Sequence, residues 1–451
     1  MKKYKKIPKI KNGHWLLGNI SAVKDDPLHF YQESIKNYGD IFQFRIGHKK
    51  SIFINNPEYV KHILQKNSNS YSRHTGLAPL KDITGDALAV SDGEIWKKKR
   101  KLITPLFHKN KIEAYFDNIQ GHIESKISDW DKTGEAWLFD SLSSVTLSVI
   151  SDFTIGEGLE DEREKIENNL LRLFEIAFDR MKKGIPKWLP KTNQKEFNRL
   201  ANGLNSIIES QIKRRESEED IKEDLISMLL LASDSGNFKR SEIIGEILSI
   251  VLAGYETTSI ASFRAIRYIL SRPDILEKLK KEFETITKGQ KLRLEHLSDF
   301  QYTTSIINES LRLSSVIWTI ARESINNDVI DGYKIPKGTS IFISPFTMHR
   351  NIKYWENPND FNPERFEKKI EHLYSFIPFG RGPRMCVGST FSILEMKIII
   401  YHIVMSGYKI MVPEKTKFHQ TITLRPKMDV IITKNETKDQ IMEREILYDF
   451  L

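Results

Sequence analysis

Cys386 is the only cysteine among the 451 residues, and it lies in a segment suited to a reactive side chain. The segment reads FGRGPRMCVG, from Phe379 to Gly388. Gly380 and Gly382 predict a tight loop with positive-φ positions, because glycine adopts such angles without steric cost. The apolar pattern after Gly388 predicts a helix. We therefore expect Cys386 on a loop that enters a helix.

Several chemical roles are open to a cysteine in this position. Backbone N–H groups and the positive end of a helix dipole stabilise a thiolate, and Arg381 and Arg384 add positive charge nearby. A single cysteine excludes a disulfide within the chain and disfavours a structural zinc site, which needs four Cys or His ligands. Three roles remain: a nucleophile beside a histidine, the axial ligand of a haem iron, and an inert core cysteine.

A second candidate site lies in the long helix predicted from Ser241 to Arg272, whose centre reads AGYETT. Gly254 costs about 1 kcal/mol relative to alanine inside a helix, so we expect a close neighbour there, such as a flat macrocycle. Thr257 can donate its hydroxyl to the Ala253 carbonyl and loosen the helix locally. Glu256 is an acid at the same place.

Trp96 and Arg100 are four residues apart in a predicted helix and therefore share one face. Their indole N–H and guanidinium can point at the same anion, although a core tryptophan beside a surface arginine is the alternative. The lysines around them form the densest basic run of the chain. We expect a solvent-facing patch that could receive an acidic redox protein, made by Lys97, Lys98, Lys99 and Lys101.

The rest of the chain predicts the elements that position these residues. Long amphipathic segments predict a helix-rich protein, and residues 41–47 and 50–56 predict a β-hairpin. The late stretches YKIMVP and TITLRPKMDVIIT predict another hairpin, whose turn lies near residues 420–423. No linker or repeat divides the sequence, so we expect a single domain over residues 1–451. The charged tail, residues 434–451, predicts a surface helix.

Charge and hydropathy limit the partners. The formal net charge of +9, from 69 Lys and Arg against 60 Asp and Glu, is modest for this length and does not imply a nucleic-acid partner. The basic N-terminal stretch contains too short an apolar run for a signal peptide or a membrane span. We expect a monomeric, cytoplasmic protein without a transmembrane anchor.

The spacing of Phe379, Gly382, Arg384, Cys386 and Gly388 closely resembles the haem-binding loop of the cytochrome P450 family. The similarity extends over nearly the whole chain through five motifs in the family's order. It implies a mainly α-helical fold with small β-sheets, the cytochrome P450 fold, with the Cys386 thiolate as axial ligand of haem b. The haem contacts that the resemblance implies are Trp96, Arg100, Ala253, Gly254, Arg322, Phe379, Arg384, Cys386 and Gly388.

The resemblance also assigns roles to the acids and alcohols. Splitting an O–O bond requires two protons, so Thr257 would order water and Glu256 would resupply protons. Glu309 and Arg312, three residues apart on a helix, match a pair that the family joins to an arginine at the place of Arg365. These last three residues would support the fold and would not be catalytic.

The substrate contacts implied by the resemblance are Leu88, Val316, Ile317, Trp318 and Ile422. Most members of the family carry proline where this sequence has Ser314, Ser315 and Trp318, which puts the path of residues 316–320 in doubt. The motifs look most like soluble bacterial branches that hydroxylate fatty acids and other apolar chains. Terpenoids and steroids are substrates of the same kind.

The resemblance implies that O2 is the oxidant and that NAD(P)H-derived electrons arrive from a ferredoxin or flavodoxin with its reductase. Three other functions share the same loop. A peroxide-driven hydroxylase needs no reductase, an isomerase or dehydratase with thiolate-bound haem needs no electrons, and a haem-based sensor forms no product.

Overall fold

The computed structural model describes residues 4–11, 13–73, 80–156, 160–183, 192–217, 224–234, 238–410, 418–434 and 443–445. Contacts between Cα atoms group the chain into two compact units. Unit 1 comprises Met1–Thr75, Gln301–Cys386 and Phe418–Arg425, and unit 2 comprises Gly76–Phe300, Val387–Lys417 and Pro426–Leu451. Because both units draw on separated stretches, no single cut in the sequence divides them. The single domain stays a prediction.

Unit 1 is built on a five-stranded sheet with the strand order β1-β2-β8-β5-β3. β1 and β2 are antiparallel and confirm the predicted hairpin, whereas β2 and β8 are parallel. Two smaller antiparallel pairs, β6 with β7 and β10 with β11, accompany this sheet. The strands are β1 (Ile41–Ile46), β2 (Lys49–Ile54), β3 (Tyr71–Arg73), β5 (Ile320–Ser324), β6 (Asp328–Ile330), β7 (Tyr333–Ile335), β8 (Ser340–Ile343), β10 (Phe418–Gln420) and β11 (Leu424–Pro426).

Several helices of unit 1 are short, and some, such as α2, are capped by a side chain. In α2, the Asp26 side chain accepts the His29 N–H at 3.0 Å, and Gly39 with φ 83° follows the last helical residue. The buried face of α2 stacks Tyr31 on Phe53 of β2, with ring centroids 4.4 Å apart. The helices and helical turns are α1 (Ile20–Asp25), α2 (Pro27–Tyr38), α3 (Pro57–Lys61), η1 (His62–Lys66), η2 (Ser68–Ser70), α14 (Gln301–Leu313), α15 (Pro345–Met348), η7 (Pro363–Glu367) and η8 (Leu373–Ser375).

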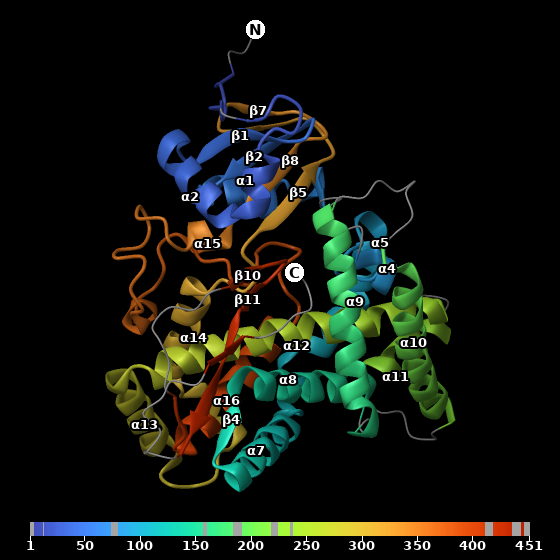
Figure 1. Ribbon diagram of the computed structural model, residues 1–451, viewed down its shortest axis with the longest axis vertical. Helices are drawn as coiled ribbons and strands as arrows, with labels where there is room; N and C mark the ends of the chain where they lie inside the picture. Colours follow the sequence, from blue (N-terminus) through green and yellow to red (C-terminus); the bar gives the residue numbers. More distant parts are fainter. Residues whose placement is uncertain are drawn as a thin grey trace. The chain divides into compact units, whose positions relative to one another are not determined.

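Unit 2 is mostly helical and is organised around the long helix α12, which runs across it beside α8 and α16 (Figure 1). α8 and α12 are long and apolar enough to cross a membrane by length and composition, but 83% and 78% of their most apolar windows are buried inside the protein. The helices and helical turns are α4 (Lys81–Thr84), α5 (Gly93–Ile103), η4 (Thr104–Phe107), α6 (Lys109–Glu113), α7 (Phe116–Thr133), α8 (Leu138–Ile155), η5 (Glu160–Glu162), α9 (Arg163–Lys183), α10 (Gln194–Ser217), α11 (Leu225–Asp234), α12 (Arg240–Leu270), α13 (Pro273–Thr287), η6 (Leu294–Ser298) and α16 (Ser389–Met405).

The strands of unit 2 form one small sheet. β12 (Met428–Thr433) pairs antiparallel with β4 (Glu135–Trp137), β9 (Lys409–Ile410) and β13 (Glu443–Glu445). The pairing of β9 with β12 confirms part of the predicted late hairpin, whereas residues 418–426 form the separate pair β10 and β11 in unit 1. The helix predicted for the tail is wrong at residues 443–445, which are a strand, and its other residues after 434 lie outside the described residues.

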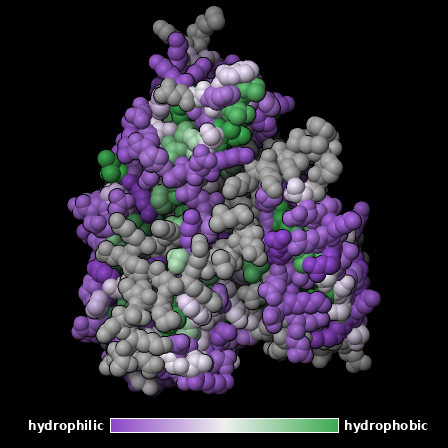
Figure 2. Space-filling model, viewed as in Figure 1, coloured by the Kyte–Doolittle hydropathy of each residue, from purple (hydrophilic) through white to green (hydrophobic). Residues whose placement is uncertain are grey.

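Polar side chains dominate the surface. Figure 2 shows a largely hydrophilic face on which hydrophobic residues occur as small separate patches. Large apolar side chains that are exposed include Trp15, Ile352 and Leu373. Single exposed apolar residues are normal on a folded protein and need no special explanation.

Candidate active site

The cysteine loop closes on itself before it reaches the helix. The Cys386 N–H donates to the Phe379 carbonyl at 2.9 Å, and the Met385 N–H donates to the Gly382 carbonyl at 3.0 Å. Gly388 is the N-cap of α16, so the predicted loop at a helix entrance is confirmed. The Cys386 side chain is exposed. Cys386 is therefore accessible to solvent, two residues before the N-cap of α16.

Two glycines give this loop its shape, but for different reasons. Gly380 and Gly382 have φ of 69° and 77°, which confirms the predicted positive-φ positions. A Cβ on Gly382 would overlap with the Leu64 carbonyl oxygen, whereas a Cβ on Gly380 would meet only Ile320 Cδ1, at 3.9 Å. Gly382 therefore serves both backbone conformation and close packing, and Gly380 serves conformation alone.

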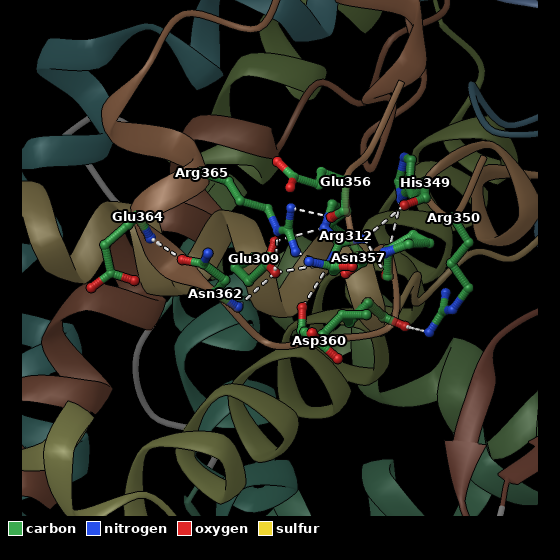
Figure 3. Close-up of polar contacts among 12 residues, drawn as sticks. Glu309, Arg312, His349, Arg350, Glu356, Asn357, Asp360, Asn362, Glu364 and Arg365 are labelled. Atoms are coloured by element: carbon green, nitrogen blue, oxygen red, sulfur yellow. Dashed lines mark hydrogen bonds and ion pairs between the residues drawn. The ribbon is translucent and has the colours of Figure 1, made fainter. Parts of the chain in front are cut away.

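A buried ion network lies upstream of the loop in unit 1 (Figure 3). The Arg312 guanidinium binds both carboxylate oxygens of Glu309, at 2.7 and 2.8 Å, and neither side chain is exposed. Arg365 Nε adds a third contact to Glu309 at 3.2 Å, and the Asn362 N–H adds a fourth at 2.8 Å. The predicted joining of Glu309, Arg312 and Arg365 is confirmed.

His349 extends this network toward the cysteine loop. Arg312 Nη1 donates to the His349 carbonyl at 2.8 Å, and His349 Nε2 accepts the Ile377 N–H at 2.9 Å. Burial lowers the pKa of His349 to about 3, so the ring is neutral and keeps Nε2 available as an acceptor. The Ser315 hydroxyl lies 3.0 Å from His349 Nδ1. Sequence reasoning missed His349, because a lone histidine in a loop carries no spacing signal.

One face of α12 is less covered than the rest of the helix. From Gly245 to Arg267, the residues of α12 that are not buried are Ala253, Gly254 and Thr257. The spacing i, i+1 and i+4 puts them on one side. The Thr257 hydroxyl donates to the Ala253 carbonyl at 2.7 Å, as predicted, and Glu256 is only 3% exposed.

Gly254 lies close to another helix. A Cβ at this position would lie 2.7 Å from Ile150 Cγ1 of α8. The packing of α8 therefore requires glycine here, and the haem contact of Gly254 stays a prediction. Thr146 of α8 reinforces the helix contact by donating its hydroxyl to the Tyr255 carbonyl at 3.1 Å.

Trp96 and Arg100 share one face of α5, as predicted. Together with Lys97, Lys101, Thr104 and Pro105 they line a depression of about 430 Å³ in unit 2. Both Trp96 and Arg100 are half-buried. A depression lined by an indole and cationic side chains suits a carboxylate with an apolar body.

The predicted basic patch is wrong for one of its lysines. Lys97, Lys98 and Lys101 are exposed, but Lys99 is buried and its ammonium lies 2.9 Å from the buried carboxylate of Glu246. Position 99 falls on the inner face of α5 because the helix turns by 100° per residue. Sequence reasoning missed Glu246, whose only signal was a charged residue within the apolar pattern of α12.

The substrate residues predicted in unit 1 are brought together by backbone pairing. Ile317 forms a bridge with Thr423, and the Leu424 N–H donates to the Val316 carbonyl at 2.9 Å. Ile317 and Ile422 are half-buried, and Val316 is buried. The path of residues 316–320 is therefore an extended segment that leads into β5.

Trp318 has a structural role in unit 1. Its indole N–H donates to the Thr421 carbonyl at 2.6 Å, and its ring packs in the aromatic core of unit 1 with Tyr31, Phe53 and Leu424. Trp318 therefore anchors residues 421–424, and its contact with substrate stays a prediction. Its bulk and its satisfied N–H are typical of a core tryptophan.

The remaining predicted residues have these positions. Leu88 is buried in the loop between α4 and α5. Arg322 is buried on β5, where its Nη1 donates to the Ala321 carbonyl at 2.9 Å. Arg384 and Phe379 are half-buried in the cysteine loop. A Cβ added to Gly388 would lie 3.6 Å from the Phe107 ring.

The residues present fit a thiolate-bound haem. In unit 1, Cys386 is exposed at the end of a hydrogen-bonded loop. In unit 2, α12 by itself has a less covered face with small side chains. Arginines and an indole N–H are donors that suit the two carboxylates of a haem. Among the described residues, no group of three or more His, Cys, Asp or Glu side chains could hold a metal ion. In a thiolate-bound haem, the porphyrin would supply the equatorial ligands of the iron and Cys386 one axial ligand.

The chain was compared with known proteins. The family model "Cytochrome P450" matches residues 8–437. The chain is 28% identical to Protein LUTEIN DEFICIENT 5, chloroplastic, of Arabidopsis thaliana, covering 88% of this chain and 71% of that protein. It is 25% identical to the cyclooctat-9-en-7-ol 5-monooxygenase of Streptomyces melanosporofaciens, with 85% of each chain covered. It is 26% identical to human Cytochrome P450 4X1, covering 86% of this chain and 82% of that protein.

These relatives come from a plant, a bacterium and an animal, and they include a chloroplast protein, so the bacterial branch and the cytoplasmic location stay predictions. The family match covers nearly the whole described chain and agrees with the helical fold and the cysteine loop. The chain belongs to the cytochrome P450 family, and it is a monooxygenase that uses haem b, O2 and NAD(P)H-derived electrons supplied through a partner.

Proposed function

We propose that this protein hydroxylates an apolar organic molecule, such as a fatty acid, terpenoid or steroid, with electrons from a separate ferredoxin or flavodoxin and its reductase. The observation that carries the proposal is the exposed Cys386 sulfur at the end of a closed loop. A thiolate-bound haem supplies the oxygen activation and the oxidation of an unactivated C–H bond. The protein supplies binding, orientation and protons.

Cys386 is the proposed axial ligand. Backbone hydrogen bonds of the loop fix the direction of the side chain, and the N-terminus of α16 favours the thiolate over the thiol. The Phe379 carbonyl accepts the Cys386 N–H, so the backbones of these two residues are neighbours in the loop. The Phe379 ring is proposed to limit water at the sulfur and so to tune electron donation.

Thr257 and Glu256 are the proposed proton path. The Thr257 hydroxyl hydrogen is directed to the Ala253 carbonyl, so its oxygen is oriented to accept a hydrogen bond from water on the uncovered face of α12. Glu256 is buried, so a proton can reach it from solvent only through ordered water or after rotation of its side chain.

Four residues are proposed to bind the propionates: Trp96 and Arg100 from α5, Arg322 from β5 and Arg384 from the cysteine loop. The depression lined by Trp96 and Arg100 supports this assignment for α5. Guanidinium groups bind carboxylates through two parallel hydrogen bonds, which gives orientation as well as affinity.

Apolar side chains are proposed to select the substrate, namely Leu88, Val316, Ile317 and Ile422. Such a wall favours hydrocarbon over charged groups through the burial of apolar surface. One relative is a monooxygenase of cyclooctat-9-en-7-ol, whose name describes a hydrocarbon-rich alcohol. This relative supports the proposal of an apolar substrate.

The test begins with the reduced protein under carbon monoxide. Thiolate ligation places the Soret band at the long wavelength typical of this ligand, and Cys386→Ser should abolish that band. Fatty acids, terpenes and steroids are then screened for spectral shifts, and positive compounds are incubated with NADPH and a surrogate ferredoxin and reductase. Product formed with peroxide alone, or without any electron source, would replace the proposal with one of the other haem-thiolate functions.

A further inference from the structure

A single buried carboxylate joins three parts of unit 2. Glu246 of α12 is 0% exposed and accepts the Leu88 N–H with both of its oxygens, at 3.0 Å each. Lys99 of α5 brings its ammonium to 2.9 Å from Glu246 Oε1, and its side chain is only 4% exposed. Glu246 therefore holds the loop that contains Leu88 and the helix α5 against α12.

The backbone at this place has little freedom to move. A Cβ on Gly245, the neighbour of Glu246, would overlap with the Thr84 carbonyl oxygen at the end of α4. Thr84 is four residues before Leu88. Thr84 lies against Gly245 and Leu88 binds Glu246, so this segment contacts two successive residues of α12. α4 and α5 both lie at the N-terminal end of α12 (Figure 1).

The charges of the pair are balanced within the protein. A carboxylate without solvent contact is costly unless it is paired and hydrogen-bonded, and Glu246 has both kinds of partner. Burial raises the pKa of Glu246, while the Leu88 N–H and the Lys99 ammonium act in the opposite direction. Lys99 also lies 3.7 Å from Glu242 and above the Phe238 ring. The Lys99 ammonium is therefore in contact with two carboxylates and one aromatic ring.

We propose that Glu246 and Lys99 are positioning residues, which fix the Leu88 wall of the substrate site and the orientation of Trp96 and Arg100. Lys99 directly precedes Arg100 in α5, so a rotation that frees Lys99 also moves Arg100. The Leu88 side chain follows its backbone, whose N–H is held at Glu246. The roles of Leu88, Trp96 and Arg100 rest on the proposed function.

The variants separate charge from shape. Glu246→Gln keeps one acceptor oxygen for the Leu88 N–H but leaves the Lys99 charge without its nearest partner. Lys99→Met keeps the apolar stem but leaves the Glu246 charge. The double variant removes both charges and keeps the acceptor, so it should restore much of what each single variant loses. Glu242→Gln is the matched control, since Glu242 is one turn away on α12, is 36% exposed and is the more distant partner of Lys99.

Hydrogen exchange of residues 85–92 measures directly how firmly Glu246 holds the Leu88 backbone. We expect the Leu88 amide to exchange about tenfold faster in each single variant and near the original rate in the double variant and in Glu242→Gln. Lys99→Arg, which retains the charge, should also stay near the original rate, and Glu246→Gln alone tests the proposal if Lys99→Met does not fold. Unchanged exchange in Glu246→Gln and Lys99→Met would overturn the proposal.

Ligand binding to the haem-loaded protein tests whether the Leu88 wall of the substrate site has moved. 4-Phenylimidazole must place a phenyl ring against the apolar wall, whereas imidazole needs only the iron. We expect the ratio of their dissociation constants to shift about fivefold against 4-phenylimidazole in the single variants and to recover in the double variant. Faster exchange with an unchanged ratio would make Glu246 a purely structural anchor and overturn the proposal. A wild-type protein without a thiolate-haem spectrum would instead overturn the proposed function, and the exchange rates would still decide whether Glu246 holds the loop.

Discussion

The Arg312 guanidinium lies against the Glu309 carboxylate through two hydrogen bonds of 2.7 and 2.8 Å, and both side chains are 0% exposed. A charge left without a close partner in this place would be costly, because both side chains are shielded from solvent. Arg312→Lys removes the two-pronged contact and the donors to the His349 and Pro358 carbonyls. Lysine keeps the positive charge but leaves these carbonyls without their donors, so we expect a loss of about 1 to 3 kcal/mol in the free energy of unfolding, measured by urea denaturation.

The same substitution at an exposed pair provides the control. Arg272 contacts Asp274 at 2.9 Å, with side chains that are about half exposed or more. Because solvent screens this pair, Arg272→Lys should change the free energy of unfolding by less than about 0.5 kcal/mol. Equal losses in the two variants would mean that burial of the Glu309 and Arg312 pair does not determine its contribution.

The two glycines of the cysteine loop predict unequal effects. Gly380→Ala introduces only the cost of a positive φ, about 1 to 2 kcal/mol, because no atom lies closer than 3.9 Å to the new Cβ. Gly382→Ala has the same backbone cost and also overlaps with the Leu64 carbonyl oxygen, so the loop must move. We expect Gly380→Ala to retain the thiolate-type spectrum with carbon monoxide and Gly382→Ala to lose most of it. Similar spectra in both variants would contradict the packing role of Gly382.

His349 predicts a dependence of stability on pH. Its folded pKa is about 3, below the ordinary value of 6.5, so between these values the unfolded chain binds a proton that the folded protein does not. Stability should therefore fall as the pH decreases from 6.5 toward 3, by about 1.4 kcal/mol per pH unit for this residue. The protonated ring would also lose the acceptor for the Ile377 N–H, nine residues before Cys386.

The measurement compares urea midpoints of the wild type and His349→Gln at pH 7 and pH 5. His402, whose pKa burial lowers to about 4, contributes a slope of the same sign in both proteins and cancels in the comparison. The variant should be less stable at pH 7 but lose less stability on acidification. Parallel losses in the two proteins would show that His349 is not the group that titrates.

The helix contact at Gly254 predicts a measurable coupling with Ile150. Gly254→Ala gains helix propensity but places a methyl group 2.7 Å from Ile150 Cγ1, and such overpacking costs about 1 to 3 kcal/mol. Ile150→Ala makes room at the same place, because it removes both Cγ1 and Cδ1, the atoms closest to the new methyl group. We expect the double variant to be more stable than the sum of the two single effects predicts, as measured in a double-mutant cycle. Additive effects would place the strain elsewhere than at the contact of α8 with α12.

Sequence reasoning was most successful where one local feature determines the structure. Positive φ at Gly380 and Gly382, the Thr257 bond to Ala253 and the contact of Glu309 with Arg312 all follow from residue type and short spacing. It could not identify neighbours that are remote in sequence, and the solvent-facing position predicted for Lys99 was wrong for this reason. Lys99 is turned inward by Glu246, Gly254 is explained by Ile150, and the Trp318 indole binds the Thr421 carbonyl.

The proposed proton path predicts the effect of Thr257→Ala. Without the hydroxyl, water on the uncovered face of α12 loses its ordered partner, so protons should reach the oxygen less reliably. We expect NADPH consumption to persist while product formation falls by about 100-fold, the low end for general acid and base catalysis, with electrons recovered as peroxide. Thr257→Ser keeps the hydroxyl and should preserve most of the coupling.

A neighbouring threonine distinguishes this role from helix packing. Thr258 follows Thr257 on α12 but is buried, and its hydroxyl lies 3.2 Å from Ser392 Oγ of α16 within unit 2. Thr258→Ala should therefore lower stability slightly and leave the ratio of product to NADPH unchanged. If both alanine variants release peroxide to the same extent, the loss comes from disturbance of α12, and Thr257 has no part in proton delivery.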